Sequence, residues 1–314
     1  MNSRVHPKYK TKYRVSNWRE YDRGLVRRGK VTFWLSREAL AAWSPHPGGR
    51  RGGQRRYSDL AIETALTLRL VFHLPLRQVE GFLCSLFDLM GVELDVPDHT
   101  TLSRRSKALR IDLRGALAKE PVHLIVDSTG LSIVGEGEWA AVKHGGKGKR
   151  GWRKLHLAVD RTGVMLAQAL TPGNADDAAQ AGDLLEAGPG QLASFTADAA
   201  YDTGAVYEAA KARGAHVIVP PVRNARPSGR RPRSRARDRT VRRVRALGRR
   251  RWMKASGYHR QATVENTFFR YKTILGSSLR AQRPDAQQVE ARIACNVLNR
   301  MLELTRPASY AIGA

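Results

Sequence analysis

The sequence predicts an α/β fold in which a small helical domain precedes a mixed sheet with flanking helices. Residues 57–115 carry apolar side chains at helical spacing, with helix-start and helix-stop residues between the segments. From Val122 onward the pattern changes to short apolar or alternating runs separated by turns, with helical segments between them. At 314 residues the chain is long enough for two domains.

Three helices are expected within residues 57–115. Ser58 is a suitable N-cap for the first helix, Pro75 can open the second, and the third begins near Asp98. The third helix carries two basic residues on its polar side, Arg104 and Arg105. Three short helices with a basic last one are typical of helix-turn-helix DNA-binding domains. A helical cap with a solvated basic face fits the same pattern.

The sheet is expected to begin with the apolar run Leu124–Val126, which suits a central strand covered on both faces. An alternating segment at 154–159 and a returning segment at 164–170 follow it, with a turn between them. Two further short strands, at 194–197 and 216–219, are separated by helical segments. An antiparallel meander followed by strand, helix and strand is the arrangement of ribonuclease H-like domains.

Two acids follow predicted strands, and a third lies on a predicted helix. Asp127 follows the central strand and Asp198 follows a later one, and a carboxylate in such a place is costly to ionise unless a positive group such as a metal ion lies beside it. Glu265 lies about 100° round its helix from an apolar stripe, on the same face as Lys272. In ribonuclease H-like domains, acids from these three places converge. The alternative for Asp127 is a turn-forming residue before Ser128.

The net charge of +27 is concentrated in three blocks of the sequence. Residues 1–56 carry +12, residues 143–154 carry +6, and residues 223–251 carry +13 from 14 Arg against one Asp. Charge placed in blocks implies a polyanionic partner. The two cysteines are far apart and no zinc-ligand spacing is present, which is typical of a reducing, intracellular setting. No run of about 18 apolar residues occurs, so membrane insertion is not expected.

The domain boundaries follow from these patterns. We expect a basic N-terminal arm and linker at 1–56, a helix-turn-helix-like domain at 57–115, a ribonuclease H-like domain at 116–305 with an Arg-rich insertion at 223–251, and a C-terminal tail at 306–314. The Pro-containing front of the insertion disfavours regular structure, whereas its second half is expected to form a short helix when its charges are neutralised.

Several stretches carry a resemblance to a known family. They read NWREYDRGLVRRGKVTFWL, RRYSDLAIETALTLRLVFHLPLRQVEGF, HLIVDSTGLSIVGEGEW, KHGGKGKRGWRKLHLAVD and ADAAYD. From about Ser16 to Glu303 the sequence resembles the DDE transposases of bacterial insertion sequences, in the insertion-sequence-five superfamily. The positions that match the catalytic acids of the family are Asp127, Asp198 and Glu265.

The family pattern around the third acid is Tyr, two residues, Arg, three residues, Glu, six residues, Lys. This sequence matches it at Tyr258, Glu265 and Lys272, but Gln261 stands at the Arg position, with Arg260 one place early. The resemblance implies that the three acids hold two Mg²⁺ ions, with Mn²⁺ able to substitute. It also implies that Tyr258, Gln261 and Lys272 lie beside the scissile or flanking phosphates.

The implied reaction is cleavage of a DNA strand by water at the end of the element, followed by attack of the released 3′-hydroxyl on target DNA. The implied partner is double-stranded DNA, bound by a homodimer or higher oligomer in the bacterial cytoplasm, at the nucleoid. The residues expected to bind DNA are Tyr258, Lys272, Lys143, Arg153, Lys154, Arg104, Arg105, Arg242 and Arg243. A non-catalytic DNA-binding descendant and a basic RNA-binding protein remain as alternatives.

Overall fold

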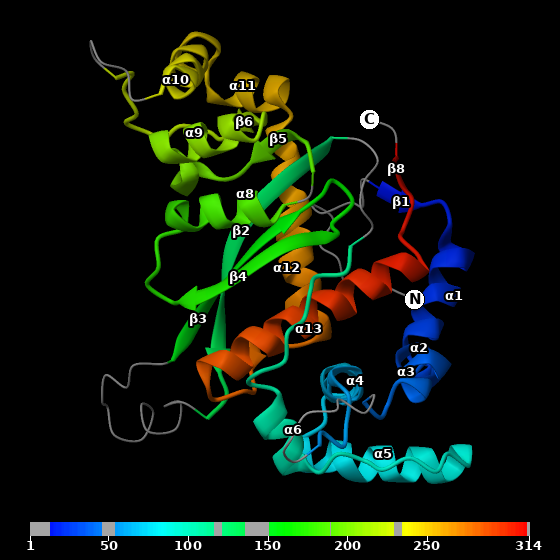
Figure 1. Cartoon of the computed structure of the whole chain (residues 1–314). Coiled ribbons are helices and arrows are strands. Elements are labelled where there is room, and N and C mark those ends of the chain that lie inside the picture. Colours follow the sequence, from blue (N-terminus) through cyan, green and yellow to red (C-terminus); the bar gives the residue numbers. More distant parts are fainter. Residues whose placement is uncertain are drawn as a thin grey trace, which may run out of the picture.

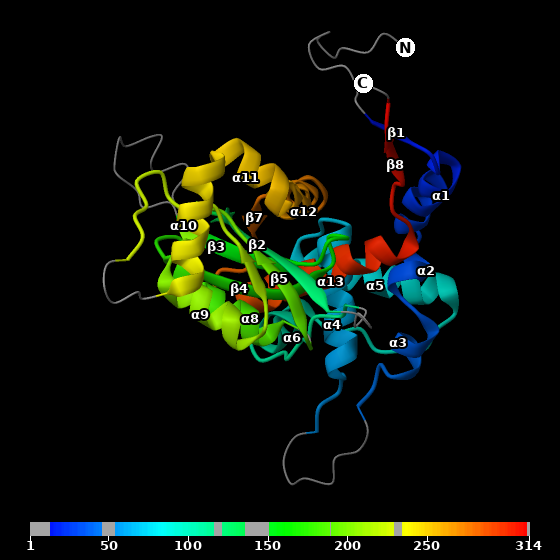
Figure 2. The same ribbon diagram turned by 90° about the horizontal axis from the view of Figure 1, so that it is seen from above.

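The computed structural model describes residues 13–45, 54–115, 121–135, 151–188, 190–228 and 234–312. Its centre is a mixed sheet flanked by helices, as Figures 1 and 2 show. The strands follow the order β4-β3-β2-β5-β6, and a short strand β7 pairs with the end of β2. Their bounds are β2 Val122–Ile133, β3 Trp152–Val159, β4 Met165–Pro172, β5 Leu192–Thr196, β6 His216–Ile218 and β7 Ser278–Leu279. The predicted ribonuclease H-like class is confirmed.

Strand β2 is the central strand, as predicted. Leu124 and Val126 pack into the hydrophobic cluster on one face of the sheet, whereas Ile125 and Leu131 pack into the cluster on the other. The strand does not end at Asp127, however. It continues to Ile133 because its antiparallel pairing with β3 runs on to Ser132, opposite Trp152. Asp127 therefore lies within the strand, neither at its end as expected nor in the turn that was the alternative.

The two faces of the sheet are covered by different helices. Helices α8 (Ala181–Ala187) and α9 (Gly204–Ala212) pack on one face, and α9 is capped by the Thr203 hydroxyl, which accepts from the Val206 amide. Helices α12 (Ala262–Ile274) and α13 (Pro284–Leu304) cover the other face. The predicted apolar stripe of α12 is buried throughout, at Val264, Phe268, Tyr271 and Leu275.

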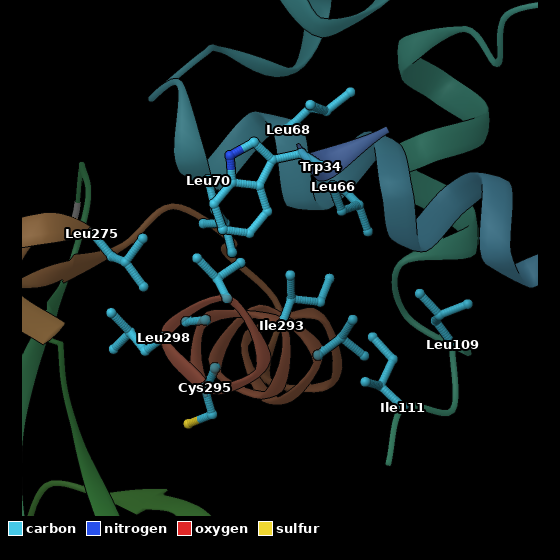
Figure 3. Close-up of a cluster of buried hydrophobic side chains, with 14 of the residues drawn as sticks. Trp34, Leu66, Leu68, Leu70, Leu109, Ile111, Leu275, Ile293, Cys295 and Leu298 are labelled. Atoms are coloured by element: carbon cyan, nitrogen blue, oxygen red, sulfur yellow. The ribbon is translucent and has the colours of Figure 1, made fainter. Parts of the chain in front are cut away.

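Helix α13 is the element around which the larger core is built. It lies between the sheet and the N-terminal helices (Figure 1). Figure 3 shows Leu298 and Ile293 of this helix beside side chains that come from the N-terminal helices and beside Leu275, the residue that follows α12. On the sheet side, the Asn299 amide group bonds both the amide and the carbonyl of Met165 in β4, each at 2.8 Å.

The three helices predicted in residues 57–115 are present as α4 (Asp59–Val71), α5 (Leu76–Met90) and α6 (His99–Arg105). Their terminal signals act as expected, since Ser58 and Asp98 cap α4 and α6, and Gly91 ends α5 in a left-handed conformation. The buried side chains of these helices belong to the same hydrophobic cluster as those of α13 and one face of the sheet. The helices and the sheet thus share a core.

The N-terminal part differs from the expected basic arm. Residues 18–41 form three short helices, α1 (Trp18–Arg28), α2 (Val31–Trp34) and α3 (Arg37–Ala41). They are held by aromatic burial, because Trp34 and Trp43 are in the core and the Arg300 guanidinium of α13 lies 4.6 Å from the centre of the Phe33 ring. The sequence pattern did not predict these helices because basic residues dominate the segment and its buried apolar side chains are few.

The expected C-terminal tail also has a partner. Strand β8 (Ser309–Ala311) pairs antiparallel with β1 (Tyr13–Val15), so the two ends of the described chain lie side by side, as Figure 2 shows. In the Arg-rich insertion, helices α10 (Arg235–Leu247) and α11 (Arg249–Ser256) are present, with Val241 and Trp252 buried. Among the described residues, no helix combines the length and apolar character needed to cross a membrane.

Candidate active site

The register of the central strands brings Asp127 and Asp198 to the same edge of the sheet. Strands β2 and β5 are parallel, and Ile125 lies opposite Thr196 at the end of their pairing. Each acid is two residues beyond its member of this pair. Because paired parallel strands advance together, the two carboxylates leave the paired region at the same level.

Asp127 is only partly exposed, on strand β2. One of its carboxylate oxygens accepts a hydrogen bond of 2.8 Å from the Ser128 amide. Burial raises the pKa of Asp127 from 3.8 to about 6, the Ser128 hydrogen bond opposes this, and the nearby negative charges of Asp198, Glu265 and Asp177 raise the pKa further. The Asp127 carboxylate thus lies in the field of three other acids, in a place that favours a cation.

Asp198 precedes a short 3₁₀ turn, Ala199–Tyr201, which follows strand β5. Its side chain caps this turn by accepting a hydrogen bond of 2.9 Å from the Ala200 amide. Burial raises the pKa of Asp198, and the charge of Asp177 raises it further. The Tyr201 side chain is completely buried beside this acid, and its hydroxyl has no hydrogen-bond partner among the described residues.

Glu265 lies in the first turn of α12, which packs on β2 and β3, and its side chain is exposed. Tyr258 opens a 3₁₀ turn, Tyr258–Gln261, that contacts both β2 and β5. Burial raises the pKa of Tyr258 to about 12, and the negative charges of Asp198, Glu265 and Asp127 add to this rise. The Tyr258 hydroxyl is therefore exposed to the negative field of all three acids and keeps its proton at neutral pH.

Asp177 is a fourth acid near the site, and its negative charge raises the pKa of both Asp127 and Asp198. Its Oδ1 lies 3.1 Å from the Lys154 ammonium and 3.5 Å from Nδ1 of His156, a completely buried residue of β3. It makes no capping hydrogen bond to the turn that follows. Lys154 and His156 lie on the same face of β3, which could have indicated an acidic partner there. The sequence did not show that this partner is Asp177, because Asp177 is remote from them in the chain.

Gln261 does not face the solution, although the family pattern suggested that it lies beside DNA phosphates. Its side chain is buried, with the residue only 4% exposed. The Gln261 amide donates a 3.0 Å hydrogen bond to the carbonyl of Val126, the residue before Asp127. The Gln261 side chain therefore contacts the strand that carries Asp127 instead of the solution.

The basic residues expected to bind DNA differ in their exposure and in whether they pair with other groups of the protein. Arg104, Arg242 and Arg243 are exposed, and Lys272 is partly exposed. Lys154 is paired with Asp177, which leaves it no free charge for DNA.

Two other expected DNA contacts are also partnered within the protein. Arg105 forms an ion pair with Asp59 and donates to the Tyr57 carbonyl at 3.0 Å, whereas Arg153 donates to the Gln287 side chain at 2.8 Å. Lys143 lies outside the described residues. The surface available to bind a polyanion is therefore smaller than the sequence suggested.

The donor chemistry at this edge of the sheet fits a divalent ion. Carboxylate oxygens are hard ligands of the kind that Mg²⁺ prefers, and beside the effect of burial the pKa of Asp127 is raised by nearby negative charges that a cation would neutralise. In the part of the chain that the structure describes, no three acidic, histidine or cysteine side chains are close enough to hold an ion as they stand. The predicted site shared by Asp127, Asp198 and Glu265 stays a prediction.

Comparison with protein families gives two matches, both to models described as "Transposase DDE domain". One match covers residues 26–136, and the other covers residues 118–300, which is more than half of the chain. The second match includes all three candidate acids and the whole of the sheet. Both are compatible with the insertion-sequence-five superfamily. With two matches to this family, one of them over more than half of the chain, and a ribonuclease H-like sheet, this chain belongs to the DDE transposase family.

Proposed function

We propose that the protein binds the terminal inverted repeats of its insertion sequence and catalyses metal-dependent cleavage and strand transfer of DNA. The observation that carries this proposal is the β2–β5 register, which places Asp127 and Asp198 at one edge of the sheet, in electrostatic reach of Glu265. Family membership supports a transposase that acts on DNA. The order of steps, the repeats and the metal requirement are our inference.

Asp127, Asp198 and Glu265 are the residues that would hold two Mg²⁺ ions, and Mn²⁺ would substitute for them. Two such ions supply charge stabilisation to both the attacking and the leaving oxygen of an in-line displacement at phosphorus. The Tyr258 hydroxyl, with its raised pKa, donates a hydrogen bond to a phosphate oxygen beside the acids. Lys272 supplies a positive charge from the same helix as Glu265.

The chemistry needs no covalent nucleophile from the protein. Water cuts the strand at the end of the element, and the released 3′-hydroxyl attacks target DNA. Ser128, next to Asp127, serves instead through its backbone amide, which orients the Asp127 carboxylate.

Two basic surfaces are suited to hold the DNA. The first is the exposed face of α10, which includes Arg242 and Arg243. The second is a groove of about 640 Å³ beside α4 and α6, in which Arg104 is the exposed arginine without an ion pair among the described residues, because Arg55 and Arg105 pair with Asp59 and Arg56 pairs with Asp95. Contacts to phosphates from these surfaces would set the position of the duplex without reading its sequence. A homodimer or higher oligomer assembled on the DNA, at the nucleoid, would bring two ends of the element together.

The test is substitution of each candidate acid by Ala, with Glu186→Ala, an exposed acid of α8, as the matched control. Asp127→Ala, Asp198→Ala and Glu265→Ala should each abolish Mg²⁺- or Mn²⁺-dependent nicking of a duplex that carries the ends of the element. Binding of that duplex should remain nearly intact, because affinity for DNA comes mainly from phosphate contacts elsewhere. An alanine variant that nicks at the rate of the control would show that its acid is not a ligand.

The same assay separates the alternatives. Gln261, which stands where the family pattern has Arg, favours a non-catalytic descendant as the second candidate. Such a protein would bind duplex DNA without nicking it in either metal ion. A preference for RNA over duplex DNA would instead indicate the basic RNA-binding protein.

A further inference from the structure

A buried ion pair joins the Arg-rich helix α10 to the turn that carries Asp198. Asp202 ends the 3₁₀ turn that begins after Asp198, and its side chain is 0% exposed. Arg237 of α10 contacts it through two parallel hydrogen bonds, from Nε to Oδ1 and from Nη2 to Oδ2, each 2.8 Å long. This bidentate arrangement fixes the relative orientation of the two groups as well as their distance.

The Asp202 carboxylate has a further partner. Its Oδ2 accepts a 3.1 Å hydrogen bond from the amide of Val222, in the segment that follows β6. Three segments remote in sequence therefore meet at this carboxylate: the turn after Asp198, the chain after β6, and α10. Removing Arg237 would leave a buried negative charge without its counter-charge, which proteins tolerate poorly.

Arg237 differs in its surroundings from the other arginines of α10. Arg235, Arg239, Arg242 and Arg243 are exposed, whereas the Arg237 side chain is mostly buried against Asp202. The same helix thus presents several arginines outward and directs one inward to the turn after Asp198. A charge-rich helix that served only to attract DNA would not need this inward, geometrically specific contact.

Asp198 depends on its turn for its position, because it lies beyond the last paired residue of β5. Among the described residues, the hydrogen bond of its own side chain lies within that turn, from the Ala200 amide. The orientation of Asp198 relative to Asp127 is therefore set by whatever holds the turn Ala199–Tyr201, and Asp202 is the residue at its far end.

We propose that Arg237 is a positioning residue of the active site. Through Asp202 it holds the turn that orients the Asp198 carboxylate opposite Asp127, so that α10 and this acid are held as one body when the helix binds DNA. The inference rests on the proposed function of Asp198 as a metal ligand, and it adds a residue that touches neither DNA nor metal.

The matched control is the neighbouring residue on α10. Asp238 is also buried, at 3% exposure, and its Oδ1 accepts a hydrogen bond of 2.8 Å from the Ser228 amide. It therefore ties the same helix to a segment that does not carry Asp198. Asp238→Asn removes one buried charge from α10, as Arg237→Gln does, but leaves the Asp202 contact in place.

The experiment measures three quantities on the full chain: the cleavage rate at saturating DNA, the affinity for Mn²⁺ alone, and the salt dependence of duplex binding. Arg237→Gln should lower the cleavage rate and the Mn²⁺ affinity by roughly 10- to 100-fold, as loss of a residue that orients a ligand does. The salt dependence should not change, because the Arg237 guanidinium is already engaged by Asp202. Asp238→Asn should leave the cleavage rate and the Mn²⁺ affinity at the wild-type level.

Arg237→Lys provides a second variant in case Arg237→Gln does not fold. It keeps a positive charge near Asp202 but loses the bidentate geometry, so a folded protein with weakened Mn²⁺ binding is expected. Wild-type Mn²⁺ affinity and cleavage in either Arg237 variant would overturn the positioning role while leaving the proposed function standing. Equal losses in Arg237→Gln and Asp238→Asn would also overturn it, since helix docking alone would then suffice. A wild-type protein that neither binds Mn²⁺ nor cleaves would refute the proposed function and this inference together.

Discussion

Gln261 occupies the position at which the family pattern has Arg, and its amide points inward. The hydrogen bond to the Val126 carbonyl joins the turn before α12 to the strand that carries Asp127. The elements that carry the first and third candidate acids are thus connected at a buried point beside the site. The Gln261 side chain is therefore a contact between these two elements, and it is buried away from the surface that DNA could reach.

Asp127 offers a test at the same scale that needs no substrate. Its pKa in the folded state is about 6, above the ordinary value of 3.8, so the folded state binds this proton more tightly than the unfolded state does. The ionised carboxylate therefore destabilises the fold progressively as the pH rises from about 4 through 6. The full difference between the two pKa values corresponds to a loss of at most about 3 kcal/mol in the free energy of unfolding.

We predict that Asp127→Asn gains stability relative to the wild type between pH 4.5 and pH 7. The measurement is thermal unfolding of both proteins in EDTA, so that no divalent ion compensates the charge. The difference between the two proteins is the quantity to compare, because Asp198 and other groups titrate in both. Parallel stability curves over this pH range would show that folding does not raise the pKa of Asp127.

At the scale of elements, α10 shows how a strongly basic segment becomes an ordered helix. Ser234 caps its first turn by accepting from the Arg237 amide, and Val241 provides an apolar contact to the body of the protein. The ion pair with Asp202 and the hydrogen bonds from Ser228 to Asp238 hold its N-terminal half. These contacts within the chain offset part of the repulsion among its arginines.

We predict that the double substitution of Arg242 and Arg243 by Ala flattens the salt dependence of duplex binding. Each lost phosphate contact lowers the slope of log affinity against log salt by about 0.9, so the total change is up to about 1.8. Unrelated duplexes should be affected as much as the ends of the element, because phosphate contacts carry no sequence information.

The control is the substitution of Arg19 and Arg23, two exposed arginines of α1, by Ala, which removes the same net charge elsewhere. An equal change of slope in both variants would show that α10 contributes only to general attraction. A loss confined to the ends of the element would show that α10 reads bases.

At the scale of the whole molecule, α13 joins parts that the sequence assigned to separate domains. Its buried side chains pack in one cluster with the N-terminal helices, α12 and one face of the sheet. Asn296 extends this connection to the linking segment by bonding the Arg114 amide at 2.8 Å and the Asp112 carbonyl at 3.0 Å. The N-terminal helices and the sheet should therefore unfold together.

Leu298→Ala tests this expectation, because Leu298 is a completely buried residue of α13 (Figure 3). Removal of a fully buried Leu side chain typically costs about 2–5 kcal/mol. Hydrogen exchange should show that protection falls by the same amount in α4 and in β2. Loss of protection in only one of them would indicate two separately stable units.

Local patterns in the sequence determined most of the elements and the identity of the candidate acids. The apolar run at Leu124–Val126 predicted a central strand, and the periodic stripe from Val264 to Leu275 predicted the helix that carries Glu265. Cap residues such as Ser58 marked helix ends correctly because capping depends on atoms within a few residues. The family resemblance then matched the same three acids, whose spacing in the sequence does not by itself show that they converge.

The tertiary structure decided how these parts meet. Asp127 and Asp198 are 71 positions apart, and only strand register aligns them. The inward amide of Gln261 and the contact between Arg237 and Asp202 likewise depend on pairing between remote segments, which leaves no local signature in a sequence. The N-terminal helices were hidden for the opposite reason, because their charge dominates the local pattern while a few buried aromatic side chains, such as Trp34, supply the free energy that holds them in place.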